Sequence, residues 1–391
     1  MQTKIILGKG KGFRVENGHC WVFDNEISTI DGNPQAGDVV DVFNFKENFI
    51  GRGFYSPKSK MRVRLFSRDQ NESVDKEFFK RRLLQCKAYR NQLGFQENYR
   101  LVFGEGDFLP SLIIDKFGDQ YVLQTLSAGM DKWKHLITEV LMEEFNAIGV
   151  YERNDAPVRQ LEGLEQIQGF LSAPFKSEQI INESGIQFQI DIAHGQKTGF
   201  FLDQKHNRLS IEPFVKNANV LDCFCYNGSF SLHAAKFGAT SVLGIDISPE
   251  AIALAEQNAK LNSFSHICTF QESNAFDILP DWARNKKQFD TVILDPPAFT
   301  KTRSNIHAAV RGYREVNLRA LKLVKPGGFL ITFSCSHYMG SSLFQQTIND
   351  AAHDAGKTIR QVAVLGQSQD HPIVWNVEET SYLKGLILQV I

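Results

Sequence analysis

Short apolar runs that stop at a polar residue or a proline recur through the second half of the chain, with amphipathic stretches of helical length between them. Runs rich in β-branched and aromatic side chains are typical of buried strands in a parallel sheet. From about residue 185 the regular alternation therefore predicts a doubly wound α/β sheet. Its expected strands are residues 219–222, 241–246, 267–271, 291–295 and 329–335.

One helix and the last two strands of this region are specified in more detail. A helix is expected over 249–261, because Ser248 can cap it, Pro249 suits its first turn and Glu250 lies near the positive end of its dipole. No helical stretch separates the apolar runs 360–365 and 383–391, so these should pair antiparallel. A Rossmann-like, seven-stranded sheet that ends in such a pair is associated with S-adenosylmethionine-dependent methyltransferases, although a fold alone does not fix a function.

The first 180 residues show two other patterns. Up to about residue 70, strand-like runs separated by Gly, Asn and Pro predict a small β-barrel. From about 75 to 175, mixed helical and strand-like stretches predict an α+β module. We therefore expect three domains, 1–72, 73–180 and 181–391. The expected elements before residue 180 are strands at 39–43, 49–55, 62–66, 112–117, 121–126 and 150–153 and helices at 76–93 and 132–145.

Composition excludes several classes of protein. With 391 residues, 42% hydrophobic and 22% charged, the chain resembles a soluble globular protein, and its net charge of -1 argues against a globally basic nucleic-acid coat. Its six cysteines show neither a disulfide framework nor zinc-ribbon spacing, so reduced thiols and no metal are expected. No signal-peptide core and no apolar run of the ~18 residues that span a membrane is present. We expect a cytoplasmic protein that does not enter a membrane.

A basic stripe crosses the predicted barrel. Its aromatic neighbours are Phe54, Tyr55 and Phe66, and no acidic residue interrupts it. Such a stripe can follow a phosphate backbone while its rings stack on bases. It can equally be a solvated edge strand whose charges prevent aggregation, and the pattern does not choose between the two. The basic residues are Arg52, Lys58, Lys60, Arg62, Arg64 and Arg68.

The turn after the first strand of the α/β sheet indicates the cofactor. A dinucleotide fingerprint needs three glycines, and only Gly228 is present between Asp222 and Phe230, so NAD binding is not expected. Asp222 with one late glycine better suits a cationic amino-acid ligand. Asp246 ends the second strand, where an acid can bind ribose hydroxyls, and Asn274 follows the third, where it can reach an adenine edge. The competing interpretation is that Asp222 and Asp246 only cap helices.

A carboxylate and a thiol follow two strands of the sheet. Because ligands of such sheets bind beyond the carboxyl ends of the strands, Asp295 and Cys335 should share a crevice. Pro296 and Pro297 stiffen the first loop and leave its carbonyls free as acceptors. A thiolate that adds to cytosine C6 activates C5 for methylation, with an acid near N3 to stabilise the charge. The alternative for Cys335 is a packed core thiol, which its polar flanks disfavour.

Several motifs together resemble the bacterial large-subunit ribosomal RNA 5-methylcytosine methyltransferases of the RlmI type. The likeness is carried by residues 220–230, by Asp295 to Phe299 and by Ser334 to His337, and a long match at 193–204 adds to it. Residues 18–23 resemble the start of that family's PUA domain, an RNA-binding β-barrel. Residues 154–159 and 161–164 resemble its middle module.

The resemblance implies a role for each site residue. Cys335 would be the nucleophile, Asp295 would bind the base, and S-adenosylmethionine would be the cofactor. The partner would be 23S ribosomal RNA, with a homodimer also considered. The implied cofactor-binding residues are Phe201, Gln204, Asp222, Phe224, Tyr226, Asn227, Gly228, Asp246, Ile247, Asn274 and Asp295. The candidate RNA-binding residues are Pro296, Pro297, Phe299 and Lys301 at the Asp-Pro-Pro loop and Arg52, Lys58, Lys60, Arg62 and Arg64 of the basic stripe. Lys301 could equally be solvated.

One position departs from the wider group of 5-methylcytosine enzymes. Many of them have a second cysteine directly after Asp-Pro-Pro, where this chain has Ala298, so Cys335 would act alone and the base for the C5 proton has no candidate. Cys223 and Cys225 lie in the cofactor turn, where packing is favoured over chemistry. Asp-Pro-Pro-aromatic motifs also serve amino-group methyltransferases, which leaves a guanine-N methyltransferase as an alternative. A non-catalytic RNA-binding assembly factor is the other alternative.

Overall fold

The structure, a computed structural model, describes residues 3–300 and 302–391, and the chain within it divides into two compact units. The first contains residues 1–179, 190–202 and 369–380, and the second contains 180–189, 203–368 and 381–391. The predicted boundaries at 72 and 180 remain predictions. The first unit nevertheless takes in two segments, 190–202 and 369–380, that the prediction assigned to the last domain.

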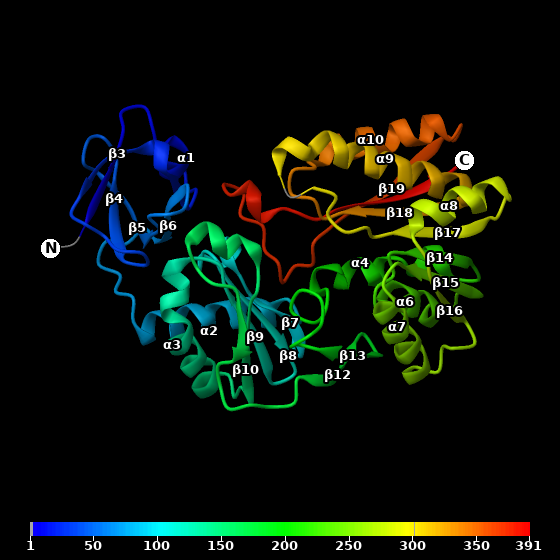
Figure 1. The fold of residues 1–391 in the computed structure, drawn as a ribbon, viewed down its shortest axis with the longest axis horizontal. Coiled ribbons are helices and arrows are strands. Elements are labelled where there is room, and N and C mark those ends of the chain that lie inside the picture. Colours follow the sequence, from blue (N-terminus) through cyan, green and yellow to red (C-terminus); the bar gives the residue numbers. More distant parts are fainter. Residues whose placement is uncertain (1–2, 301) are drawn as a thin grey trace. The chain divides into compact units, whose positions relative to one another are not determined.

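The N-terminal part of the first unit is a curled six-stranded sheet with the order β2-β6-β5-β4-β1-β3 (Figure 1). Val40, Val42 and Val63 alternate with polar residues along their strands and are fully buried in its core. The expected strands at 39–43 and 49–55 are confirmed. The elements are β1 (Lys4–Leu7), α1 (Phe13–Glu16), β2 (Trp21–Phe23), β3 (Ile27–Asp31), β4 (Val39–Phe43), β5 (Phe49–Tyr55) and β6 (Met61–Ser67).

A five-stranded sheet, β11-β10-β9-β8-β7, follows, with α2 and α3 packed against it and each other. The second helix begins at Ala128, four residues earlier than expected, because Ser127 caps it. Gly129 allows the first turn of this helix to pack directly against Phe54, because a Cβ at this position would lie 2.3 Å from the Phe54 side chain. The elements are α2 (Lys76–Gln92), β7 (Asn98–Phe103), β8 (Leu112–Phe117), β9 (Gln120–Thr125), α3 (Ala128–Glu144), β10 (Gly149–Asn154) and β11 (Ile167–Phe170). A two-stranded sheet, β12 (Glu178–Glu183) and β13 (Ile186–Asp191), comes next.

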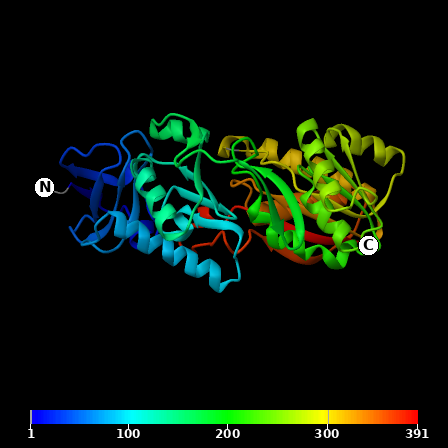
Figure 2. The ribbon, with the colours of Figure 1, turned by 90° about the horizontal axis from the view of Figure 1, so that it is seen from below.

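The second unit is the predicted doubly wound sheet, with seven strands in the order β16-β15-β14-β17-β18-β20-β19. The first five are parallel, and β20 pairs antiparallel with both β18 and β19, as expected. Helices α8, α9 and α10 cover one face and α4, α6 and α7 the other (Figures 1 and 2). The strands are β14 (Asn219–Cys223), β15 (Ser241–Asp246), β16 (Cys268–Glu272), β17 (Phe289–Leu294), β18 (Val324–Ser334), β19 (Ile359–Gly366) and β20 (Lys384–Val390).

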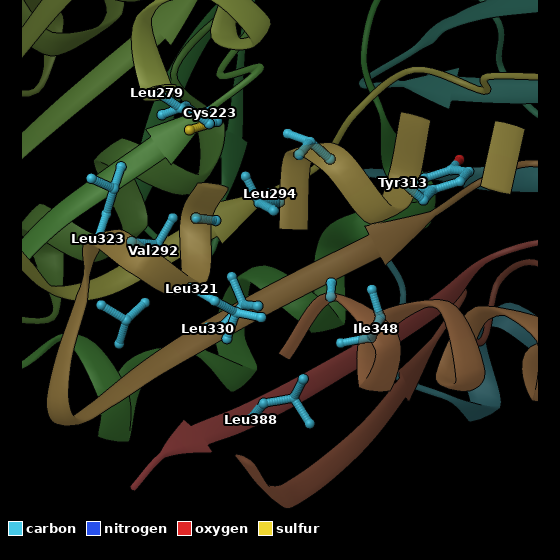
Figure 3. Packing of buried hydrophobic residues seen from close by; sticks show 14 of the residues in the cluster. Cys223, Leu279, Val292, Leu294, Tyr313, Leu321, Leu323, Leu330, Ile348 and Leu388 are labelled. Atoms are coloured by element: carbon cyan, nitrogen blue, oxygen red, sulfur yellow. The ribbon is translucent and has the colours of Figure 1, made fainter. Parts of the chain in front are cut away.

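The helices of this unit bury its apolar strands. Figure 3 shows Val292 and Leu294 of β17, Leu330 of β18 and Leu321 of α9 in one apolar cluster, and all four are 0% exposed. Helix α7 has its expected bounds, and the Ser248 hydroxyl accepts a hydrogen bond from the Ala251 N–H at 3.1 Å. The helices are α4 (Lys205–Ser210), α5 (Glu212–Val215), α6 (Ser229–Lys236), α7 (Pro249–Leu261), α8 (Ala275–Arg284), α9 (Ile306–Leu323) and α10 (Ser341–Asp354). Across the described residues, no helix combines the length and the apolar character needed to cross a membrane.

Candidate active site

The carboxyl ends of the five parallel strands meet at one edge of the seven-stranded sheet. The register pairs Cys223 with Ile245 on β15 and with Leu294 on β17, and pairs Leu294 with Thr332 on β18. The segments after these strands therefore leave the sheet side by side. Because β20 runs the opposite way, its amino-terminal residue Lys384 reaches the same edge, opposite Ser334.

The turn after β14 has an unusual backbone. Phe224 and Tyr226 have φ angles of 63° and 48°, a left-handed region that side chains rarely adopt, and Gly228 follows at 77°. The Tyr226 N–H donates to the Asp246 carboxylate at 2.9 Å, which ties the turn to the end of β15. Strained backbone of this kind persists where the surroundings enforce it, and it clusters at ligand sites.

Two buried side chains in this turn keep polar atoms without a hydrogen-bond partner among the described residues. Asp222 Oδ2 accepts from the Ser231 hydroxyl at 2.6 Å, but Oδ1 has no partner, and neither does the side-chain amide of Asn227. Burial, together with the nearby charges of Asp295 and Asp246, raises the pKa of Asp222 to about 7, against the hydrogen bond from Ser231, which lowers it. An ammonium or sulfonium ligand would lower this cost. The turn therefore fits a cationic amino-acid group.

The helix-capping interpretation of Asp222 and Asp246 is wrong. Helix α6 begins after Gly228 and α7 after Ser248, so neither carboxylate is an N-cap. Asn274 is the residue that caps a helix, since its side-chain oxygen accepts from the Phe276 N–H at 3.0 Å.

Two apolar side chains stand exposed beside these polar groups. Ile247, directly after Asp246, is 67% exposed, and Phe276, two residues after Asn274, is 37% exposed. Exposed apolar groups next to an acid at a strand end suit a flat ring of a ligand. Phe276 was not predicted, because a single aromatic residue in a helix is indistinguishable from a core residue in the sequence.

Two further predicted cofactor residues lie outside the strand ends. Gln204 is buried, and its Oε1 accepts from Asn207 Nδ2 at 2.5 Å; the same Asn207 nitrogen donates to the Gly366 carbonyl at 2.8 Å, which places the pair at the end of β19. Phe201 belongs to the first unit, where the Lys197 ammonium lies 4.2 Å from the centre of its ring.

The predicted acid and thiol segments come together at the sheet edge. The Asp295 N–H donates to the Cys223 carbonyl at 3.4 Å, and the Cys335 thiol donates to the Pro296 carbonyl at 3.8 Å. The expectation that the Pro-Pro loop leaves a carbonyl free as an acceptor is met at Pro296, which is buried, while Pro297 is exposed. Cys335 is partly exposed, so its sulfur is not a packed core thiol.

The serines that flank Cys335 support the loop rather than line a surface. Ser334 and Ser336 are both 0% exposed, and the Ser336 hydroxyl is hydrogen-bonded to the Tyr313 hydroxyl at 2.9 Å. The Phe299 ring packs against the Tyr313 ring at a tilt of 46°, with ring centres 4.5 Å apart. Tyr313 was missed because it lies on a helix face, where its spacing predicts only a core position.

A row of rings joins the cofactor turn to the thiol loop. Phe276 lies between Phe224, at 6.5 Å from ring centre to ring centre, and Phe299, at 5.7 Å. The row continues through Tyr313 to the segment that carries Cys335. The edge therefore combines an acidic, partly unsatisfied turn with a thiol and a carboxyl group, an arrangement suited to transfer from a cationic donor to a planar ring.

Comparison with known proteins agrees with this arrangement. Residues 165–388 match the S-adenosylmethionine-dependent methyltransferase family, and residues 5–68 match the PUA-like domain. Ribosomal RNA large subunit methyltransferase I of Shewanella denitrificans is 41% identical over 397 aligned residues, with all of both chains covered. The protein of that name from Pseudoalteromonas atlantica is 40% identical over 395, again with full coverage. The chain belongs to the ribosomal RNA large subunit methyltransferase I family.

Solved structures show the fold of the family. A structure described as a SAM-dependent methyltransferase from Streptococcus mutans covers all of this chain with a TM-score of 0.84 at 20% identity. A second methyltransferase, solved in complex with SAH, gives 0.85 at 20% identity. S-adenosylmethionine is the cofactor of the methyltransferase family, and the unsatisfied groups of the cofactor turn fit it.

The other cysteines of this family member are unsuited to nucleophilic chemistry. Burial raises the pKa of Cys223 and Cys225 well above the usual thiol value, and raises that of Cys268 to about 12. Cys20, also partly exposed, has its pKa raised by burial and by Glu105. The preference for packing over chemistry at Cys223 and Cys225 agrees with their burial. Among residues 3–300 and 302–391, no group of three or more His, Cys, Asp or Glu side chains is arranged to hold a metal ion.

Two residues of the basic stripe are structural in this methyltransferase. Arg52 is 8% exposed and its Nε lies 2.8 Å from Asp41, and Arg64 is 3% exposed and lies 2.8 Å from Glu162. These buried ion pairs leave neither guanidinium to meet a phosphate, which corrects the prediction for both. The edge-strand alternative is also wrong, because β5 and β6 are interior strands and β2 and β3 form the edges.

The remaining basic residues of the stripe are accessible. Lys58 and Lys60 are exposed, and Arg62 is partly exposed, with hydrogen bonds to the carbonyls of Ser56 and Pro57. Lys60 lines a cleft of about 660 Å³ together with Arg14 of α1. Lys301 lies outside the described residues. The accessible part of the stripe is therefore Lys58, Lys60, Arg62 and Arg68, and Arg68 donates to the carbonyls of Ile50 and His19.

Proposed function

We propose that this protein methylates carbon 5 of a cytosine in 23S ribosomal RNA, through a covalent adduct between Cys335 and carbon 6. The observation that carries the proposal is the meeting of Cys335 with the Asp295-Pro296-Pro297 loop at the sheet edge, next to the cofactor turn. The names of its full-length relatives support a large-subunit ribosomal RNA substrate, and the PUA-like domain supports binding to RNA.

The protein groups have separate roles in this reaction. The Cys335 thiolate forms the sulfur–C6 bond, and the π electrons of the C5–C6 double bond shift through C4 to N3, where the Asp295 carboxyl group stabilises the charge that develops. Bound S-adenosylmethionine supplies an electrophilic methyl group for C5. Loss of the C5 proton then returns an electron pair to the C5–C6 bond and releases Cys335 as thiolate.

The proposed cofactor and RNA residues follow from their surroundings. In this proposal the Asp222 carboxylate accepts hydrogen bonds from the amino-acid part of the cofactor, and the Asn227 amide both accepts from it and donates to it. Asp246 binds the ribose and Asn274 binds the adenine. The other proposed cofactor residues are Phe201, Gln204, Phe224, Tyr226, Gly228, Ile247 and Asp295. The target base is held by Pro296, Pro297 and Phe299, and Lys58, Lys60 and Arg62 contact RNA phosphates.

Bisulfite sequencing of ribosomal RNA tests the modification directly. Cells that lack the protein should lose one protected cytosine, and wild-type protein should restore it. Cys335→Ala should not, because removal of a covalent nucleophile typically costs roughly 10⁴-fold or more in rate. Restoration of the protected cytosine by Cys335→Ala would contradict the mechanism.

A trapping experiment tests the adduct itself. Ribosomal RNA with 5-fluorocytidine cannot lose its C5 substituent as a proton, so the sulfur–C6 bond should persist and form a complex stable to denaturation. The complex should require S-adenosylmethionine and Cys335. Its absence, together with methylation of guanine by the Cys335→Ala protein, would favour the guanine-N methyltransferase that the Asp-Pro-Pro motif leaves open.

A further inference from the structure

Lys384 is placed beside the thiol by the reversal of the last strand. It opens β20, which runs antiparallel to β18 with Lys384 directly opposite Ser334, the residue before Cys335. Along the sequence 49 positions separate Cys335 from Lys384 (384 − 335). In a parallel sheet, site residues are expected after the carboxyl ends of strands and not at a strand's first residue. Only the antiparallel pairing brings this amine to the edge where the carboxyl ends lie.

Two backbone carbonyls hold the Lys384 ammonium beside the thiol segment. Its Nζ donates to the carbonyl of Ser336, the residue after Cys335, and to that of Tyr382, each at 2.7 Å. The Lys384 side chain is therefore hydrogen-bonded to the residue just after Cys335, and its backbone is paired with the residue just before Cys335. A long, flexible side chain loses its rotational freedom here without an acidic partner among the described hydrogen bonds and ion pairs.

The charges around this amine couple it to the sulfur. Burial lowers the pKa of Lys384 to about 8, and ionised Cys335 opposes this by raising it. Coupling between two titrating groups is reciprocal, so the ammonium favours the thiolate by the same free energy that the thiolate favours the ammonium.

Among the described residues, the other groups that contact the thiol loop from neighbouring elements are neutral or acidic, and the imidazole on the loop itself faces solvent. Tyr313 of α9 contacts Ser336 and is neutral at neutral pH, since burial raises its pKa. Asp295, after β17, is an acid. Asp203 accepts from the Tyr382 hydroxyl at 2.5 Å and is also an acid. The imidazole of His337, on the thiol segment itself, is exposed to solvent.

We propose that Lys384 is a positioning residue that holds Cys335 as a thiolate. Cys335 loses its proton to solvent while the ammonium keeps its own, and the sulfur electron pair is then available to form the bond to C6. When that bond breaks, its electron pair returns to a sulfur that the same ammonium stabilises. The use of this thiolate in methylation rests on the proposed function, but its formation does not.

The pH profile of Cys335 alkylation tests this inference without RNA. A Cys20→Ser background removes the other partly exposed thiol, and mass spectrometry of peptides after timed iodoacetamide treatment reports Cys335 alone. Lys384→Met should slow alkylation at neutral pH about tenfold and raise the midpoint of the profile by about one pH unit. Lys384→Arg, which keeps the charge, should stay within about twofold of the parent protein.

The matched control is a lysine at the opposite end of β18. Lys325 lies 2.7 Å from Asp290, far along the strand from Cys335, and Lys325→Met should leave the profile unchanged. S-adenosylmethionine affinity of each variant, measured by calorimetry, verifies that the second unit is folded. A Lys384→Met profile that superimposes on the parent, or a Lys384→Arg profile as slow as that of Lys384→Met, overturns the inference.

This result is independent of the cytosine proposal. If Lys384→Met slows alkylation while Cys335→Ala keeps full methylation activity, the thiolate is real and the covalent mechanism fails. If alkylation is unaffected by Lys384→Met while Cys335→Ala abolishes methylation, the mechanism stands and Lys384 does not activate the thiol.

Discussion

Buried polar side chains have opposite surroundings at two places in the molecule, the N-terminal sheet and the edge of the seven-stranded sheet. In the N-terminal sheet of the first unit, Arg52 lies 2.8 Å from Asp41, and Arg64 lies at the same distance from Glu162. At the sheet edge of the second unit, Asp222 and Asn227 are equally buried but keep polar atoms that no described residue binds. Since an unpaired buried polar group costs free energy, the difference separates side chains that hold a fold from side chains that await a ligand.

The largest expected effect is on the paired side of this comparison. Arg64→Met should lower the free energy of unfolding by about 3–5 kcal/mol, because it leaves the Glu162 carboxylate buried without its cation. Urea denaturation measures this value, and a second change, Glu162→Gln, should recover most of the loss. Lys76→Met, which removes an exposed ion pair with Glu143, should change stability little. Equal losses in both variants would remove the distinction between buried and exposed pairs.

A change at the unpaired carboxylate of Asp222 should lower the affinity for the cofactor and leave folding intact. Asp222→Asn should weaken S-adenosylmethionine binding roughly 100-fold, since it removes a charge that faces a cationic ligand. The control is Asp290→Asn at the opposite end of the sheet, which should leave the affinity unchanged. Isothermal calorimetry measures both, and wild-type affinity in Asp222→Asn would return this carboxylate to a structural role.

The same carboxylate should oppose folding at high pH. Its pKa is raised in the folded protein, so the folded state holds a proton that the unfolded chain releases. Its contribution to stability is therefore present at low pH and is lost as the pH rises toward about 7. Without ligand, Asp222→Asn should melt no lower than wild type at alkaline pH, which thermal denaturation tests. A lower melting temperature there would mean that the ionised form stabilises the fold.

Affinity for the cofactor should also follow the ionisation of Asp222. Because its pKa is about 7 before a cation binds, the ionised fraction grows about tenfold between about pH 6 and about pH 8. S-adenosylmethionine affinity should therefore rise by up to about tenfold over this interval, and Asp222→Asn should abolish the rise. Calorimetry across the interval checks it, and a flat wild-type profile would contradict the role of Asp222.

The smallest effect is expected at the exposed basic residues. Replacing Lys58 and Lys60 with alanine should weaken RNA binding about threefold and reduce its salt dependence, since fewer counterions are released. Filter binding at several salt concentrations measures the slope. Lys325→Ala is the matched control for the loss of a lysine. A salt dependence of RNA binding equal to that of wild type would mean that these lysines do not contact RNA.

Local signals in the sequence predicted much of the second unit. Ser248, Pro249 and Glu250 gave the correct start of α7, and abrupt ends of apolar runs placed Asp295 and Cys335 at one edge. These signals work because capping and burial depend on neighbours within a few residues.

Signals that depend on distant partners failed. Arg64 was interpreted as a candidate RNA contact because its counter-ion, Glu162, lies about 100 residues later, and Lys384 was missed because it enters the edge from an antiparallel strand. Charge on a strand does not reveal whether it faces solvent or an acid from another element.

The path of the chain between the units has a consequence for how the protein can be divided. The chain passes from one unit to the other after residues 179, 189, 202, 368 and 380. Asp370, in the last segment that joins the first unit, accepts from the Arg100 N–H at 2.8 Å, and its carbonyl accepts from Arg90 at 2.6 Å. A fragment cut at residue 180 would therefore expose the fully buried Arg90 without one of its acceptors. No contiguous fragment therefore contains the whole of the first unit without most of the second, because segments 190–202 and 369–380 follow residues of the second unit.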